Sequence, residues 1–170
     1  DTTLITRVSG GRSSTSYVMV NPANGSRTKF PYRDNLPLLS FSEKECEAIK
    51  QADVLHLDGT RYENALKAAQ VARAVGTLVS LDGCSRQADN QLNRKLAGLA
   101  DILIMNATYP YRVSERTDRQ QALCYMASLG SPRVVMMTES GNGVYSLQDG
   151  KVVHYPAFSV TAADTTGAGD

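Results

Sequence analysis

The sequence contains no tryptophan, only two histidines and only three cysteines in 170 residues. Cys46, Cys84 and Cys124 are far apart and form no CxxC pair. An odd number of scattered cysteines argues against a disulfide framework and favours a reducing compartment. His56 and His154 occur singly in apolar, strand-like runs, where a histidine is more often packed than a ligand, so we assign neither a role.

The sequence also lacks long runs of apolar residues or of one charge. No apolar run approaches the roughly 20 residues that a membrane helix needs, and the N-terminus has no basic-then-apolar signal pattern. The 18 basic and 17 acidic residues give a formal charge of +1. This balance gives no sign of a basic surface that would bind nucleic acid or an anionic membrane. We therefore expect a soluble, cytoplasmic protein whose partners are small molecules.

Two β-prone runs near the N-terminus flank a cluster of turn residues. The stretch TSYVMVNPANGSRTKFP runs from Thr15 to Pro31, with asparagine, proline and glycine in its middle. This pattern predicts an early β-hairpin. Ser42 and Glu45 then have the spacing of a capping box, which predicts the start of a helix of about ten residues.

Strand-like and helix-like segments alternate through the rest of the chain. Short apolar strands are expected at 53–58, 77–81, 101–106 and 133–138, the first of them buried. Apolar residues recur at helical spacing at 62–75, from Leu92 to Leu99 and at 119–129. Gly76 follows the first of these helices as a C-terminal cap.

Continuously apolar strands that alternate with amphipathic helices are typical of a parallel sheet buried on both sides. We therefore predict an α/β fold, Rossmann-like in layout, with helices on both faces of the sheet. After Gly143, the segments VYSLQ and KVVHYP flank Asp149 and Gly150. That pair predicts a second hairpin with a two-residue turn.

Polar residues and glycines follow the expected strands. Asp58, Asp82, Asn106 and Thr138 each stand at or just after a strand end. Ordinary turns use the same residue types, so each one alone is ambiguous. Ligands of open α/β sheets bind at the carboxyl ends of the strands, and the convergence of these residues at one edge therefore predicts a binding site there.

Two glycine-rich segments near the C-terminus offer backbone for anion binding. TESGNG begins at Thr138 and includes Gly141 and Gly143, a plausible rim for a nucleotide, although a glycine-rich hairpin connection would use the same residues. DTTGAGD, from Asp164 to Asp170, combines two carboxylates with a Gly-Ala-Gly nest. A carboxylate at its end is suited to take a proton from an alcohol while neighbouring N–H groups stabilise a phosphoryl.

The motif ADTTGAGD, the strand VVMMT with its TESGNG loop, and the strand ADILIMN together resemble the PfkB family of carbohydrate kinases, which have the ribokinase-like fold. The resemblance covers essentially the whole chain, with its specific motifs in the last third. It implies a partial kinase domain over 1–170, with a lid hairpin at about 10–35 and an α/β core at 42–170. The family's N-terminal part and C-terminal helices would be missing, so we expect the fragment alone to be inactive.

The resemblance implies a role for each residue of the last motif. Asp170 would be the base that activates the acceptor hydroxyl. Gly167, Ala168 and Gly169 would form the anion hole for the transferred phosphoryl. Asp164 and the backbone carbonyl of Thr166 would match the monovalent-cation position of many members, which K⁺ fills.

The resemblance also implies a nucleotide site that takes ATP and Mg²⁺. Thr138, Gly141 and Gly143 would line it, and Asn106 would lie near the phosphates and their metal. The chain departs from the family twice. Asn106 is followed by Ala-Thr-Tyr where the family usually has Asn-x-x-Glu, and Ser140 stands where the loop usually has glycine. A turn shifted by one residue, onto Gly141, would restore the loop.

The implied activity is ATP-dependent phosphorylation of an alcohol group on a sugar, a nucleoside or a related small molecule. The missing acid after Asn106 leaves open a non-catalytic homologue that binds a sugar or nucleotide. A dinucleotide oxidoreductase is disfavoured because no GxGxxG follows the first strand of a βαβ unit. The early hairpin is similar to the family's lid, which in some members forms a homodimer; Arg12 and Arg27 would meet an acidic substrate group there or remain solvated.

Overall fold

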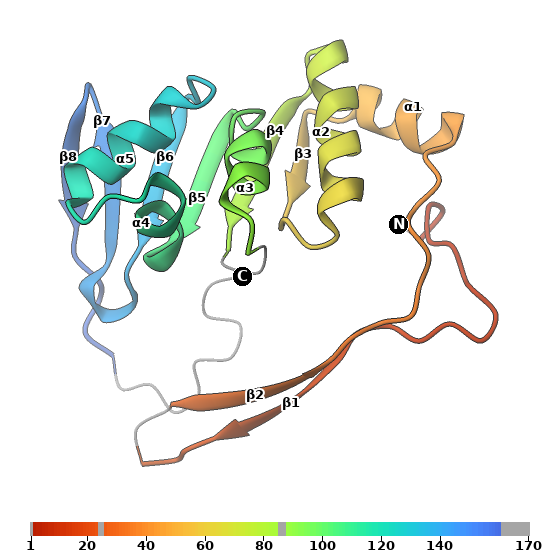
Figure 1. The fold of residues 1–170 in the computed structure, drawn as a ribbon, viewed down its shortest axis with the longest axis horizontal. Coiled ribbons are helices and arrows are strands. Elements are labelled where there is room, and N and C mark those ends of the chain that lie inside the picture. The colour runs from red at the N-terminus through yellow and green to blue at the C-terminus, as the bar shows by residue number, and fades with distance from the viewer. Residues whose placement is uncertain (1, 24–25, 85–87, 161–170) are drawn as a thin grey trace. The chain divides into compact units, whose positions relative to one another are not determined.

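The structure, a computed structural model, describes residues 2–23, 26–84 and 88–160 (Figure 1). The chain divides into two compact units. Residues 1–37 and 159–170 make up the first unit, and residues 38–158 make up the second. The predicted catalytic loop, 164–170, lies outside the described residues.

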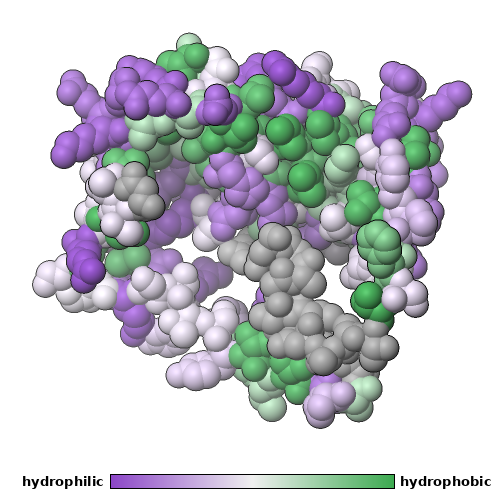
Figure 2. Space-filling view, turned by 180° about the vertical axis from the view of Figure 1, so that it is seen from behind, coloured by the Kyte–Doolittle hydropathy of each residue, from purple (hydrophilic) through white to green (hydrophobic). Residues whose placement is uncertain are grey.

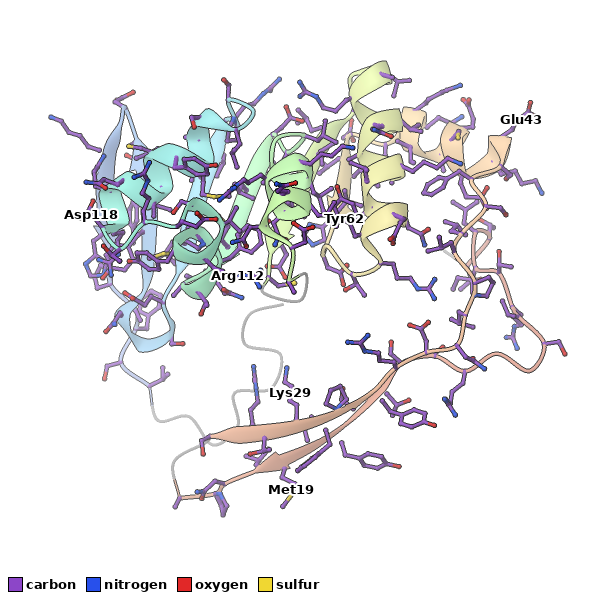
Figure 3. All side chains as sticks on the ribbon, in the orientation of Figure 1. Met19, Lys29, Glu43, Tyr62, Arg112 and Asp118 are labelled. Carbon is purple, nitrogen blue, oxygen red and sulfur yellow. The ribbon has the colours of Figure 1, made fainter. Side chains whose placement is uncertain are left out.

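The first unit contains the expected hairpin. Strand β1 (Thr15–Val20) pairs antiparallel with β2 (Arg27–Tyr32), and Tyr17 lies opposite Phe30 in the register. Side chains alternate across the ribbon, so Met19 and Lys29 point to opposite sides of it (Figure 3). The side with Met19 also carries Tyr17, which is 74% exposed, and this face of the hairpin is therefore apolar and open.

The second unit is built on a six-stranded sheet in the order β3-β4-β5-β6-β7-β8. The strands are β3 (Val54–Leu57), β4 (Leu78–Gly83), β5 (Ile102–Asn106), β6 (Val134–Thr138), β7 (Val144–Gln148) and β8 (Lys151–Tyr155). Strands β3 to β6 pair parallel, whereas β7 pairs antiparallel with both β6 and β8, so the sheet is mixed. Asp149 and Gly150 join β7 to β8, both with positive φ (47° and 74°), as a type I′ turn requires.

Five α-helices and one short 3₁₀ helix are described in the second unit. They are α1 (Glu43–Gln51), α2 (Tyr62–Val75), α3 (Asn90–Ala97), α4 (Thr108–Ser114), α5 (Arg119–Ser128) and η1 (Ser140–Asn142). Within the described part of the chain, none of the helices is long and apolar enough to cross a membrane.

Local sequence signals account for the helix ends. The capping box at α1 is formed, because the Ser42 side chain accepts from the helix and Glu45 accepts from the Ser42 backbone. The Ser42 hydroxyl also donates to Glu45, which lowers the pKa of that carboxyl. Gly76 ends α2 in the left-handed conformation, with φ at 85°. Both of these predicted signals are confirmed.

The helices α2 to α5 lie on one face of the sheet (Figure 1). Parallel neighbours joined in sequential order by right-handed crossovers require this arrangement. The strand residues that face these helices are almost fully buried: Val79, Leu81, Leu103, Met105, Val135 and Met137. They form the core together with the alanine-rich side of α2.

The opposite face of the sheet is apolar too, and Figure 2 shows hydrophobic residues gathered on it. Ile104 is 40% exposed there, and its neighbours Ile102 and Met136 are half-buried. The α/β prediction is confirmed, but within the described residues helices α2 to α5 cover one face and not both. The strands were predicted to be covered twice because they are apolar on both sides.

Strand β3 differs from its prediction as a buried strand. Its residues alternate between exposed and half-buried, and Val54 is 45% exposed. The reason is position, because β3 pairs only with β4 and forms an edge of the described sheet. Sequence periodicity cannot tell an edge strand from a central one when both are apolar.

Helix α4 has no counterpart in the sequence predictions. Its start is marked by Asn106, whose side-chain oxygen accepts from the N–H groups of Thr108 and Tyr109 at 3.1 and 3.0 Å. Pro110 is tolerated because it lies in the first turn, where an N–H would have no helical partner. The combination of an Asn cap and an early proline was the available signal.

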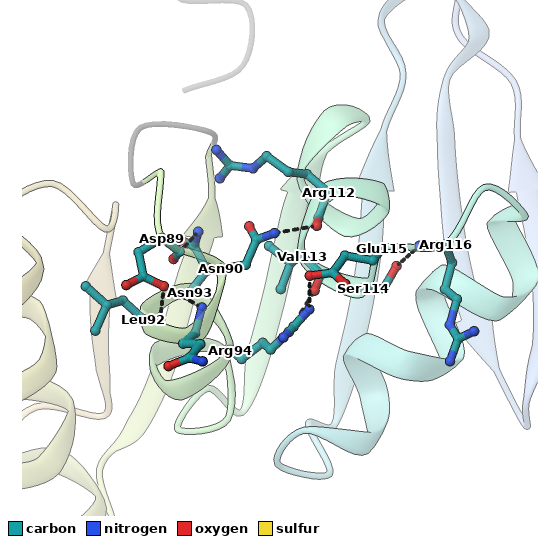
Figure 4. A network of polar contacts seen from close by, with 11 residues as sticks. Asp89, Asn90, Leu92, Asn93, Arg94, Arg112, Val113, Ser114, Glu115 and Arg116 are labelled. Carbon is teal, nitrogen blue, oxygen red and sulfur yellow. Dashed lines mark hydrogen bonds and ion pairs between the residues drawn. The ribbon is translucent and has the colours of Figure 1, made fainter.

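Contacts between α3 and the end of α4 hold the two helices together (Figure 4). The Asn90 side chain donates to the carbonyl of Arg112 at 2.9 Å. Arg94 donates to the carbonyl of Val113 at 2.9 Å and forms an ion pair with Glu115 at 2.7 Å. This network fixes where α4 lies after β5.

Asp101 directly precedes β5 and is hydrogen-bonded to both neighbouring strands, β4 and β6. It exchanges two hydrogen bonds with Val79, because its N–H donates to the Val79 carbonyl and its carboxylate accepts from the Val79 N–H. The other carboxylate oxygen is 2.8 Å from Arg73. The Asp101 carbonyl accepts from the N–H groups of Arg133 and Val134 at the start of β6.

Candidate active site

The carboxyl ends of the parallel strands meet at one edge, as predicted. Asn106 and Thr138 are direct partners in the β5–β6 register, so the structure places these two predicted residues side by side. Asp82 lies near the end of β4, and Asp58 follows β3. Asp58 is engaged locally, since both its oxygens accept from Thr60, at 2.8 and 2.6 Å.

The loop that follows β6, residues 138–143, is closed by its own backbone. The Glu139 N–H donates to the Gly143 carbonyl at 2.8 Å, and the Asn142 N–H donates to the Glu139 carbonyl at 2.9 Å. The Gly143 N–H donates to the Ser140 carbonyl at 3.0 Å. These three donors are therefore used inside the loop and are not available to an anion.

The turn in this loop is not shifted to Gly141. Ser140 itself adopts positive φ, 47°, in the left-handed region that favours glycine. Gly141 has open space around it, with no atom within 4 Å of an added Cβ. The positive φ therefore falls on Ser140, in a strained conformation, and the structure shows no turn shifted onto Gly141.

Gly143 is required by its surroundings. Its φ is 92°, and a Cβ added there would lie 2.1 Å from the carbonyl oxygen of Tyr155 and 2.6 Å from the nitrogen of Ala157. The close approach of the two backbones brings the loop against the end of β8. Of the two glycines predicted in this segment, Gly143 fixes the loop and Gly141 fills an open position.

Side chains from three elements frame the same loop. The Arg119 guanidinium carbon lies 3.6 Å from the centre of the Tyr145 ring. Tyr145 stacks on His154, with ring centroids 4.5 Å apart and planes inclined by 14°. Arg119 also forms an ion pair with Glu139 at 2.9 Å, and His154 Nε2 is 2.6 Å from the Asn142 carbonyl.

Burial tends to lower the pKa of Arg119, but Tyr111, Glu139 and Tyr145 outweigh it and raise that pKa. Arg119, Tyr145 and His154 were not among the predicted site residues. The pairing of Tyr145 with His154 could have been predicted from the sequence. The Asp149-Gly150 turn fixes the register of the β7–β8 hairpin, and this register makes the two residues direct partners.

Tyr109 occupies the position where the resemblance leads us to expect an acid. It is 2% exposed, and its hydroxyl donates to the Asn93 carbonyl at 3.4 Å. Its ring packs so closely on β4 that a Cβ at Gly83 would lie 2.8 Å from it. Burial raises the pKa of the phenol above its ordinary value. Position 109 is therefore part of the core and does not face a ligand.

Beside the strand ends lies an open depression of about 560 Å³. It is lined by Ala107, Thr108, Tyr111 and Arg112. Figures 3 and 4 show Arg112 projecting from α4. This places one cation on the lining of the depression, together with two residues that follow β5 directly, Ala107 and Thr108.

The described residues offer little to a divalent metal. Within 2–23, 26–84 and 88–160, no group of three or more His, Cys, Asp or Glu residues could hold an ion. Thr138 is occupied as well, since its hydroxyl donates to the Met105 carbonyl at 3.4 Å. The remaining predicted residues lie outside the described chain: Asp164, Thr166, Gly167, Ala168, Gly169 and Asp170.

The chain is similar in sequence to known carbohydrate kinases. The model of the pfkB family carbohydrate kinases matches residues 1–170. An ATP-dependent ribose-1-phosphate kinase from Halopiger xanaduensis is 33% identical over 129 residues, covering 72% of this chain and 39% of that protein. Ribokinase from Haemophilus influenzae is 29% identical over 176 residues, covering 100% of this chain and 56% of that protein.

Solved structures share the fold. Ribokinase from Giardia lamblia superposes with a TM-score of 0.79 at 18% identity, over 95% of this chain and 53% of that one. The chain therefore spans about half the length of such relatives. With a family match over all 170 residues and the ribokinase architecture in the structure, the chain belongs to the pfkB family of carbohydrate kinases.

Proposed function

We propose that the whole protein transfers the γ-phosphoryl group of ATP to a hydroxyl of a sugar or related small molecule. The family match over 1–170 carries this proposal. The sheet edge supports it, because Asn106 and Thr138 are partners there and the 138–143 loop follows directly. The relatives' names support it further, since they include an ATP-dependent ribose-1-phosphate kinase and a ribokinase.

In this proposal Asp170 is the general base. It takes the proton of the acceptor hydroxyl as that oxygen forms a bond to the γ-phosphorus and the bond to the leaving ADP oxygen breaks. The backbone N–H groups of Gly167, Ala168 and Gly169 stabilise the charge that develops on the phosphoryl oxygens. The sequence motif supports these roles, because it places a carboxylate directly after a Gly-Ala-Gly nest.

Asn106, Thr138, Gly141 and Gly143 form the nucleotide side of the proposed site. Asn106 orders the α4 turn beside the phosphates, and Gly143 fixes the loop next to Thr138. A divalent cation, ordinarily Mg²⁺, neutralises phosphate charge in reactions of this class. We place a K⁺ ion at Asp164 and the Thr166 carbonyl, on the motif alone.

For the acceptor we propose a sugar, sugar phosphate or nucleoside that the hairpin closes over. Arg12 supports the hairpin, since its guanidinium lies 4.0 Å from the centre of the Tyr32 ring and its backbone pairs with Asn35. Arg27, at the start of β2, is the candidate for an acidic acceptor group. Replacement of Arg27 by alanine should raise KM for a phosphorylated acceptor, and an unchanged KM for every such acceptor contradicts this role.

We also propose that the hairpin's open apolar face joins two copies of the protein. The face carries Tyr17, Met19, Phe30 and Tyr32, all more than half exposed. A double replacement of Tyr17 and Phe30 by serine should convert a dimer to a monomer in light scattering after size exclusion. A wild-type monomer at micromolar concentration, or a dimer that survives the replacement, contradicts the proposal.

A second candidate is a homologue that binds a sugar or nucleotide without turnover. The burial of Tyr109 favours it, because this side chain cannot supply the carboxylate expected beside the phosphates. The two candidates predict the same ligands and differ in ADP release.

The deciding experiment is an ADP-release assay on the whole protein with Mg²⁺, ATP and K⁺. The acceptors are ribose, fructose, ribose 1-phosphate and adenosine. The Asp170→Asn variant is compared with Asp149→Asn, which changes an acid in the β7–β8 turn. Turnover that collapses only in Asp170→Asn supports the kinase. Binding of ATP or acceptor without turnover supports the second candidate.

The piece comprising residues 1–170 should be inactive by itself. It spans about half the length of the relatives, and we expect the rest of such a protein to contribute groups that hold either substrate. The same assay on that piece tests this expectation, and acceptor-dependent ADP release from it would refute the expectation.

A further inference from the structure

We propose that Arg119, Tyr145 and His154 form a stacked clamp that holds the 138–143 loop in its nucleotide-binding conformation, with Arg119 as the main positioning residue. The inference rests on the proposed function, since it concerns the nucleotide side of that site. It assigns no contact with ATP to the clamp residues. Their effect on the nucleotide passes through the loop.

The clamp is a three-layer stack of groups from separate elements. Arg119 is the first residue of α5, Tyr145 lies on β7 and His154 lies on β8. The guanidinium is 3.6 Å from the Tyr145 ring centre, close enough for a cation–π contact. The Tyr145 and His154 rings are nearly parallel, 4.5 Å apart, and the strand register makes them direct partners.

Each end of the stack holds a different side of the loop. Arg119 pairs with the Glu139 carboxylate at 2.9 Å, and His154 Nε2 lies 2.6 Å from the Asn142 carbonyl oxygen. The ion pair is shielded from solvent in part, because the Arg119 and Glu139 side chains are 33% and 25% exposed. The two anchored residues flank Ser140, which is the strained residue of the loop.

The strain at Ser140 explains why a clamp is needed. A serine at φ 47° is less favourable than a glycine there, so an unrestrained loop would move away from this conformation. Such strain persists where the surroundings hold the backbone on both sides. Arg119 and His154 supply that restraint, and a glycine at position 140 would make it unnecessary.

The test is a double-mutant cycle in the whole protein between Arg119→Met and Ser140→Gly. Arg119→Met should weaken ATP binding about tenfold, by isothermal titration, and leave acceptor KM unchanged. Ser140→Gly should restore most of that loss. Arg119→Lys should fall between wild type and Arg119→Met, because it keeps the charge but loses the planar stack.

Arg133→Met is the matched control. Arg133 is an exposed arginine that precedes β6 at its opposite end, so its replacement removes the same charge without touching the loop. The control should bind ATP as wild type does. An equal loss in Arg133→Met would show a general charge effect and overturn the proposal, as would a loss in Arg119→Met that Ser140→Gly does not relieve.

Amide hydrogen exchange tests the clamp proposal independently of the proposed function. The N–H groups of Asn142 and Gly143 are hydrogen-bonded within the loop and should exchange faster in Arg119→Met and more slowly again in the double variant. If the wild type binds no ATP, the proposed function fails, while the exchange rates still decide the clamp. Unchanged exchange in Arg119→Met overturns it.

Discussion

The ends of β5 and β6 are neighbours in the sheet, and at each end one residue differs from what the family resemblance leads us to expect. At the β5 end, Tyr109 replaces an acid and its side chain enters the core. At the β6 end, Ser140 replaces a glycine and keeps the loop in place with a positive φ. The first change alters the chemistry available to a ligand. The second leaves a serine in a strained backbone conformation.

The segments that follow β5 and β6 are also held in place by different contacts. The loop after β6 is held by three internal hydrogen bonds and by side chains from α5 and β8. The segment after β5 is held by the Asn106 side chain at its start, by the packing of Tyr109, and by the contacts of α3 with the end of α4. Variants at these two ends should therefore differ in what they destabilise.

The largest expected effect follows from restoring the acid with Tyr109→Glu in the whole protein. The change removes an aromatic ring from the core and buries a carboxylate, which should lower the free energy of unfolding by about 4 kcal/mol. Thr108→Glu, one residue earlier and exposed, should cost less than about 0.5 kcal/mol. Denaturant unfolding measures both. A Tyr109→Glu protein as stable as wild type would show that position 109 is not in the core.

For the loop that follows β6, the most destabilising substitution should be Gly143→Ala. The added Cβ meets the Tyr155 carbonyl at 2.1 Å, and φ is 92°, so we expect a loss of about 3 kcal/mol in unfolding free energy. Gly141→Ala is the control, because it has open space and should be nearly neutral. Thermal and urea unfolding compare the two. Equal stability of the two variants would mean that the loop does not approach β8 as described.

A smaller effect should follow from Asn106→Ala. The variant removes the acceptor for two N–H groups at the start of α4 and should cost about 1 kcal/mol of stability. Asn106→Asp keeps the acceptor and should retain most of the stability. Urea unfolding of the pair gives the capping contribution, and ATP titration of Asn106→Asp then reports any separate role near the phosphates. A stable Asn106→Ala would rule out the cap.

The effect that is smallest at neutral pH, where it vanishes, is a pH dependence of stability at Tyr109. Burial raises the pKa of this phenol above the ordinary 10.0, so above that pH the unfolded chain loses a proton that the folded chain retains. This contribution to stability is complete below about pH 10 and falls by about 1.4 kcal/mol per pH unit above it. Tyr109→Phe should remove that slope, measured by urea unfolding between pH 9 and 11. Tyr17→Phe, at an exposed position, is the control, and equal slopes in both variants contradict the burial argument.

Much of the second unit could be predicted from local patterns. The helix 62–75 is found at those bounds, the capping box at Ser42 forms, and the Asp149-Gly150 turn joins two strands. These signals are local, because caps and turn residues act within a few positions. Two features could not be predicted in this way: which faces of the sheet the helices cover, and the position of β3 at the edge of the sheet. Both depend on which distant segments pack together, and hydrophobic periodicity does not indicate that.

The site was predictable in its position and less so in its contacts. The placement of Asn106 beside Thr138 follows from parallel strands, since their carboxyl ends share an edge. The burial of Tyr109 could not be inferred because it depends on how α4 packs against β4, and the local signals of the helix, the Asn106 cap and Pro110, do not encode that packing. The link from Arg119 to Glu139 joins residues 20 positions apart on different elements, and no local pattern encodes it.

The paired hydrogen bonds between Asp101 and Val79 also bear on how the chain avoids misfolding. A slip of β5 by one residue against β4 would turn Ile102 and Ile104 beneath the helices and expose Leu103 and Met105. Because both faces are apolar, hydrophobicity alone penalises that error weakly. The slip would break the Asp101 carboxylate's bonds to Val79 and Arg73 together. The hydrogen bonds and the ion pair of one acidic side chain thus favour the correct register of β5 against β4.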